Sequence, residues 1–130
     1  MKRYSLLSAA LALSLLLAAI NIVAISFYLY WTLWWFDNMM HFLGGFTLGF
    51  FAIYFFSSSI SSGKISLTKG LVLSFIGVMT IAVAWEVFEY VTGQTVSTEA
   101  YPLDVLHDLI SDTLGALLAL SISKRILKSF

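Results

Sequence analysis

Acidic and histidine side chains recur at helical spacing along an otherwise apolar sequence. Asp37 and His41 are four residues apart and Glu86 and Glu89 are three apart, so each pair shares one face of a helix. A third set continues the same spacing: Asp104, His107, Asp108 and Asp112. Mixed imidazole and carboxylate ligands suit zinc, manganese or iron better than magnesium or calcium, which prefer oxygen ligands alone. The residue types therefore predict a divalent-metal site.

Each of these residues has an expected role in such a site. The expected metal ligands are His41, Glu86, His107 and Asp108. Glu89 or Asp112 is the expected general base, which would accept a proton when the cation activates water or polarises a phosphoryl or acyl oxygen. Asp37 and Asp104 lie near the expected starts of helices, where an acid serves equally well as a solvated cap.

The surroundings of these residues are overwhelmingly apolar. Of the 130 residues, 60% are hydrophobic and 11% are charged, and the mean hydropathy is +0.94. No water-soluble domain of this size carries that composition on its surface, so the expected solvent is lipid. Cysteine is absent, which excludes disulfides and thiolate metal sites. No basic patch outside the membrane flanks indicates a nucleic-acid partner.

Four apolar segments are each long enough to cross a bilayer as a helix. At about 1.5 Å of rise per residue, about 20 residues cross a hydrocarbon core of about 30 Å. The segments are 6–30, 39–60, 70–90 and 103–122. Backbone groups cannot stay unpaired in lipid, and the sequence lacks the alternating pattern of barrel strands. The predicted fold is an all-α polytopic membrane protein, a four-helix transmembrane bundle formed by a single domain, 1–130.

Small residues and turn residues mark the packing and the connections of these helices. Gly45 and Gly49 stand on one face of the second segment, where they would let a neighbouring helix approach closely. A polar stretch, 57–64, is expected to form one turn, and Gly93–Tyr101 is expected to form the connection before Pro102 begins the last helix.

Charges separate between the two ends of the predicted bundle. The basic residues all flank one side: Lys2, Arg3, Lys64, Lys69, Lys124, Arg125 and Lys128. The acidic residues all fall at or toward the other side: Asp37, Glu86, Glu89, Glu99, Asp104, Asp108 and Asp112. The positive-inside rule places the basic side in the cytoplasm. We therefore expect a plasma-membrane protein with both termini in the cytoplasm and the acidic cluster toward the outer face.

Three of the acids are expensive to bury. Counting about 1.5 Å per residue from Lys124 places Asp112 roughly 18 Å into the membrane, near its middle. An ionised carboxylate there costs about 2.5 to 3.5 kcal/mol, so Glu86, Asp108 and Asp112 together would cost roughly 8 to 10 kcal/mol if unpaired. Every Lys and Arg lies at the far side. The charge must therefore be neutralised by protons or by bound cations.

A family resemblance rests on four short stretches of this sequence. Asp37-Asn38-Met39-Met40-His41-Phe42, Gly44-Gly45, the Glu86 and Glu89 pair, and Asp104, Asp108 and Asp112 with Gly115 resemble the VanZ-like membrane proteins, and more closely the YjdF-like small bacterial membrane proteins. The resemblance covers the second to fourth spans. It implies a multi-spanning membrane protein without an established reaction, although the VanZ-like group is linked by name to glycopeptide resistance.

Carried over residue by residue, the resemblance points to five positions: Asp37, His41, Glu86, Asp108 and Asp112. VanZ-like proteins tend to have glutamine where this chain has Glu89 and asparagine where it has Asp112. That departure weakens the transfer of a resistance role.

Three functions from different classes fit these observations. The first is a metal-dependent hydrolase or transferase acting on a lipid or a lipid-linked envelope precursor at the outer leaflet. The second is an accessory or assembly protein without catalysis, which would associate with partner helices or with further copies of itself. The third is a proton or cation relay along the acids, although the inner half offers only hydroxyls such as Ser74 and Thr80 to continue it.

Overall fold

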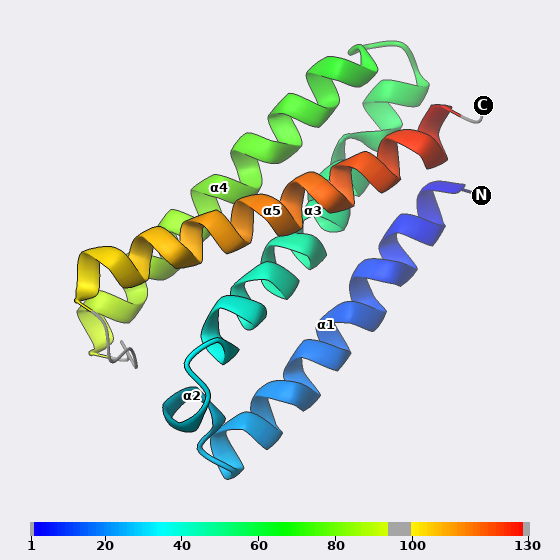
Figure 1. Ribbon diagram of the computed structural model, residues 1–130. Coiled ribbons are helices and arrows are strands. Elements are labelled where there is room, and N and C mark those ends of the chain that lie inside the picture. The colour runs from blue at the N-terminus through cyan, green and yellow to red at the C-terminus, as the bar shows by residue number, and fades with distance from the viewer. Residues whose placement is uncertain (1, 94–99, 129–130) are drawn as a thin grey trace.

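In the residues that the structure describes, the protein is a bundle of four long helices and one short helical turn. The computed structural model describes residues 2–93 and 100–128. Its helices are α1 (Lys2–Ser26), α2 (Leu29–Thr32), α3 (Phe36–Ser61), α4 (Leu67–Thr92) and α5 (Tyr101–Lys128). Figure 1 shows the long helices side by side, with α3 and α5 crossing in the middle. The prediction of an all-α four-helix bundle is confirmed.

The four long helices have the length and composition of membrane spans. Their apolar stretches are Arg3–Ser26, Phe36–Ser61, Leu67–Thr92 and Tyr101–Leu127, with mean hydropathies of 2.4, 1.6, 2.1 and 1.5. Many large apolar side chains face outward, such as Leu15, Phe55 and Val91, each about three-quarters exposed. Such exposure suits a hydrocarbon solvent, because lipid solvates these side chains as well as a protein interior does.

Local chemistry explains where the helices end. The first predicted segment extends to Tyr30, but α1 ends at Ser26 and Tyr28 takes a left-handed conformation with φ of 55°. At the other end of the bundle, Ser66 caps α4, since its hydroxyl accepts a hydrogen bond of 3.2 Å from the Lys69 amide. Gly93 ends α4 in the left-handed region.

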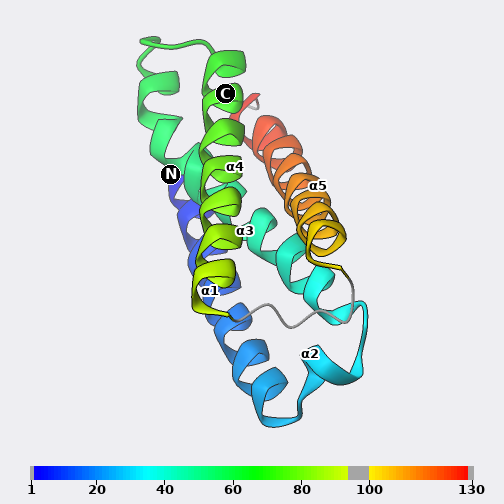
Figure 2. The same cartoon turned by 90° about the vertical axis from the view of Figure 1, so that its left-hand side faces the viewer.

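The charge separation predicted from the sequence is present in three dimensions. Both termini and the α3–α4 connection lie at one end of the bundle (Figure 2), which we call the basic end because it holds Arg3, Lys64, Lys69, Lys124 and Arg125. The start of α3, the end of α4 and the start of α5 meet at the opposite, acidic end. Glu99 lies outside the described residues.

The apolar core fills the basic half of the bundle. Its buried members come from α1, α3 and α5: Leu6, Ala10, Phe50, Ile53, Ala119, Leu120 and Leu127. In the acidic half, buried polar side chains take the place of apolar ones, among them His41, Asp108 and Asp112. Apolar packing therefore holds the basic half together, and the buried acidic side chains gather in the acidic half.

Helices α3 and α5 make the closest approach in the bundle. A methyl group added to Gly45 would collide with the backbone of Asp112, and one added to Gly115 would collide with the backbone of Phe42. A methyl group added to Gly49 would collide with the side-chain Cβ atom of Ala119. The predicted small-residue packing is thus confirmed, and its partner is α5.

Candidate functional site

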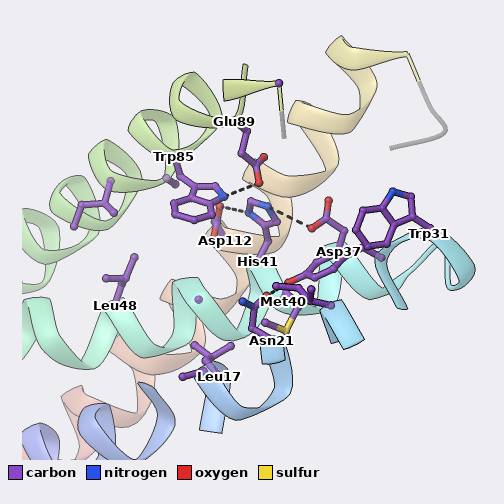
Figure 3. Close-up of a pocket in the computed structure, with 17 residues that line it drawn as sticks. Leu17, Asn21, Trp31, Asp37, Met40, His41, Leu48, Trp85, Glu89 and Asp112 are labelled. Carbon is purple, nitrogen blue, oxygen red and sulfur yellow. Dashed lines mark hydrogen bonds and ion pairs between the residues drawn. The ribbon is translucent and has the colours of Figure 1, made fainter. Parts of the chain in front are cut away.

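His41 is the centre of a buried cluster in which four carboxylates surround one imidazole ring. Its Nδ1 atom lies 3.0 Å from Asp112 Oδ2, within hydrogen-bond distance, and 3.9 Å from Glu86 Oε1. Its Nε2 atom lies 3.8 Å from Asp108 Oδ2 and 4.0 Å from Asp37 Oδ1. Figure 3 shows His41 between Asp112 and Asp37. The two ring nitrogens therefore face different pairs of acids.

The first turns of α3, the last turns of α4 and the middle of α5 supply these side chains. Asp37 and His41 are one turn apart on α3, and Asp108 and Asp112 are one turn apart on α5. Glycine at position 45 brings the backbone of α5 against α3 beside Asp112. This contact lets a short aspartate side chain reach the imidazole of the neighbouring helix.

Burial makes the charge in this cluster costly. The exposed fractions are 1% for Asp108, 4% for Glu86, 5% for Asp112 and 8% for His41. Within the described residues, Asp108 Oδ2 and Glu86 Oε1 have no hydrogen-bond partner. A buried, unpaired charged oxygen costs more than the roughly 1 to 3 kcal/mol of an unsatisfied neutral group. One imidazole cannot balance this set of acids.

Two groups of side chains in the cluster are spaced as metal ligands would be. The first group is Asp37, His41 and Asp108, and the second is His41, Glu86 and Glu89. Within each group, one ligand atom from every side chain lies within 4.8 Å of the others. Atoms that share one ion at about 2.0 to 2.2 Å lie roughly 3 to 4 Å apart, so each group needs only small adjustments to close around a cation.

The structure brings together most, but not all, of the residues singled out in the sequence. Glu86 and Asp108 both lie within 4.0 Å of His41, but they fall in separate ligand groups. Asp37 joins the group of Asp108, although the sequence left it as a possible cap. His107 is exposed, Asp104 is half-buried, and neither belongs to either ligand group among the described residues. The polar residues at three- and four-residue spacing on α5 therefore span a wider face than the one that α3 and α4 cover.

Trp85 has a polar role that the sequence does not reveal. Its indole Nε1–H donates a hydrogen bond of 2.9 Å to Glu89 Oε1, one turn further along α4 (Figure 3). Sequence reasoning favours packing or an interfacial position for this residue. The only signal of this contact in the sequence is the four-residue spacing between Trp85 and Glu89. Such spacing is too common in helices to identify a hydrogen bond.

The first span also reaches the cluster, a question that the sequence leaves open. Tyr30 donates a hydrogen bond of 2.8 Å to Asn21 Oδ1, which ties α2 to α1 beside the acids. Burial, together with the negative charges of Asp37 and Glu89, raises the pKa of Tyr30 to about 12. Its phenol therefore stays protonated and donating at physiological pH. Asn21 is the one amide in the first apolar segment, and that isolation is the signal that could have found it.

A cavity of about 830 Å³ opens beside the cluster. Most of its lining comes from helices α1 to α4. Helix α1 contributes Leu17, Ala18, Asn21 and Ile25, and α2 contributes Tyr30 and Trp31. Helix α3 contributes Asp37, Met40, His41, Gly44 and Leu48, and α4 contributes Ile81, Ala82, Trp85 and Glu89. Gly93 and Asp112 complete the lining. Asp37, His41, Glu89 and Asp112 thus face a space large enough for a small ligand.

Comparison with known proteins places the chain in a family. Neither the curated proteins nor the solved structures contain a match. The family model described as "Predicted membrane protein (DUF2238)" matches residues 1–129. This match agrees with the four candidate spans and carries no activity with it. The chain therefore belongs to this family of predicted membrane proteins over nearly its whole length.

Proposed function

We propose that this chain is a membrane-embedded metalloprotein that holds one divalent cation through Asp37, His41 and Asp108, and that uses the cation for hydrolysis or group transfer on a lipid or lipid-linked substrate. The observation that carries the proposal is the placement of Asp108 Oδ2. It is buried, it has no hydrogen-bond partner among the described residues, and it lies 3.8 Å from the Nε2 atom of His41. A cation between these atoms would satisfy both.

The hydrogen bond to Asp112 selects between the two ligand groups. A neutral imidazole carries its proton on one nitrogen and leaves a lone pair on the other. We assign the proton to Nδ1, where it is donated to Asp112 at 3.0 Å. The lone pair then lies on Nε2, which faces Asp37 and Asp108. A carboxylate, a histidine and a metal in series are a common arrangement, because the carboxylate orients the ring and raises its basicity.

This assignment changes the roles expected from the sequence. Asp112 becomes the residue that positions His41, whereas the sequence suggested a general base. Asp37 takes the ligand place expected for His107, which is exposed and outside both groups. Glu89 remains the proposed general base, since it lines the cavity and is held by Trp85. Glu86 adds negative charge on the Nδ1 side of the imidazole, where its Oε1 atom lies 3.9 Å from Nδ1.

The chemistry of the proposed site follows from its donor set. Two carboxylates and one imidazole suit zinc, manganese or iron. Such a cation lowers the pKa of bound water and polarises a phosphoryl or acyl oxygen. By the positive-inside rule the acidic end faces outward, so the substrate would come from the outer leaflet of the plasma membrane. The VanZ-like and YjdF-like resemblance agrees, since it points to all three proposed ligands.

The other two functions have less support. A relay needs polar groups that continue inward, yet the hydroxyls of Ser74 and Thr80 donate to their own helix at Gly70 and Ile76, each at 2.8 Å. An assembly role would use outward apolar faces, but these faces suit lipid equally well. An assembly role does not account for the unpartnered oxygens beside His41.

Elemental analysis of purified protein tests the proposal. We expect close to one zinc, manganese or iron per chain in wild type, and almost none in His41→Gln or Asp108→Asn, because each removes one of the three proposed ligands. His107→Gln is the matched control and is expected to keep its metal. Metal-free wild type would contradict the proposal, and loss of metal from His107→Gln would favour the ligand set expected from the sequence.

A further inference from the structure

The bundle is open on one side, between α1 and α4. Helix α3 contacts α1, α4 and α5, but no Cα atom of α1 lies within 8 Å of one in α4, as far as residues 2–93 are concerned. The cavity lies in this gap, since both helices contribute to its lining. In a membrane, such a gap faces the hydrocarbon of the bilayer and not water.

The polarity of the cavity changes along its length. Leu17, Leu48 and Ile81 line it at mid-bundle. His41 and Glu89 line it near the acidic end. Asp37 and Leu48 are 11 residues apart on α3, which corresponds to about 16 Å of helical rise. An occupant that fits this space has a polar end and an apolar end, in the same order as a lipid of the surrounding leaflet.

The charge of the lining identifies the kind of headgroup. Asp37, Glu89 and Asp112 place carboxylates on the cavity wall, and no Lys or Arg is among its described lining residues. With one dication bound, carboxylates still outnumber the positive charges nearby. An ammonium group would pair with one of the carboxylates that the cation leaves unbalanced, while a phosphate beside it could approach the cation. A zwitterionic headgroup with an amine matches both features.

We infer that the cavity binds one phospholipid with an amine headgroup, which enters sideways from the bilayer between α1 and α4. The volume of about 830 Å³ lies within the roughly 300 to 1,000 Å³ of ordinary ligand sites, so it holds the headgroup and part of one chain while the rest stays in the membrane. The inference that this lipid is also the substrate rests on the proposed function. The approach of the phosphate to the cation rests on it too, whereas the acidic lining and the polar-to-apolar order of the cavity do not.

Two neighbouring alanines allow a matched test. Ala18 and Ala19 are both exposed on α1, but only Ala18 is among the cavity lining. Ala18→Trp would fill the cavity, and Ala19→Trp would add the same bulk to lipid-facing surface. Native mass spectrometry in mild detergent, with phosphatidylethanolamine or phosphatidylglycerol added, counts the lipids retained by each variant. Metal content and helical circular dichroism are measured on the same samples.

We expect wild type and Ala19→Trp to retain one phosphatidylethanolamine, about tenfold more tightly than phosphatidylglycerol, and Ala18→Trp to lose that preference with its helical signal unchanged. Equal retention of both lipids by wild type, or equal behaviour of the two tryptophan variants, would overturn the inference. Should the variants show the expected lipid pattern without any metal, the lipid site stands and the proposed metal function fails. A metal-containing wild type without lipid preference would overturn the lipid site and leave the metal function standing.

Discussion

Replacing Gly45 by alanine is expected to be among the most damaging single changes in this protein. The new methyl group would collide with the carbonyl oxygen of Asp112 and lie 2.8 Å from its Cα atom. These are backbone atoms, so no side-chain rotation relieves the collision and α5 must move away from α3. Overpacking of this kind costs about 1 to 3 kcal/mol or more. The shift also withdraws the Asp112 carboxylate from His41, so metal binding should weaken together with stability.

Thermal unfolding in detergent, followed by metal analysis, measures both consequences. Gly77→Ala on α4 is the matched control, because nothing lies within 4 Å of the methyl group it would add. In a helix interior that change is expected to be neutral or stabilising, by up to about 1 kcal/mol. Equal melting temperatures for the two variants would mean that α3 and α5 do not approach as closely as the structure shows.

Asp112→Asn is expected to weaken metal binding by about 10- to 100-fold without abolishing it. The amide keeps the shape of the side chain, and its oxygen can still accept the Nδ1–H of His41. It removes the negative charge that makes the ring a better ligand. A competition titration against a chelator of known affinity measures the change. The expected order is therefore wild type, then Asp112→Asn, then Asp108→Asn with no measurable binding.

Asp104→Asn is the control for this series, because Asp104 lies on the same helix and belongs to neither ligand group. Its affinity is expected to equal that of wild type. If Asp112→Asn lost its metal as completely as Asp108→Asn, Asp112 would be a direct ligand and the assignment of the imidazole proton to Nδ1 would be wrong.

The helices could be predicted well from the sequence because a lipid environment permits few backbone structures. Backbone groups in hydrocarbon must be paired within the helix, so each long apolar segment became one. The end of the first helix was harder to predict. Apolar and aromatic residues continue past Ser26 through a turn at Tyr28, and no glycine or proline marks it. In this region the apolar composition indicates a lipid environment but does not indicate where the helix ends.

The candidate site was predicted in part, for a geometric reason. Helical spacing shows which residues of one helix share a face, and it pairs Asp37 with His41, Glu86 with Glu89, and Asp108 with Asp112. It does not show how wide the covered face is. Helices α3 and α5 approach closely at their glycines, and in this arrangement Asp108 is buried while His107 stays exposed. Long-range packing of this kind has no signature within either helix.

The most direct test of the proposed metal centre is X-ray absorption spectroscopy at the edge of whichever metal the purified protein retains. The proposed ligands predict a shell containing one imidazole, with all other ligands oxygen, and loss of the imidazole signal in His41→Gln but not in His107→Gln. A shell with two imidazoles would contradict the proposed ligand set. A shell of oxygen alone would remove His41 from the site and, with it, the central claim.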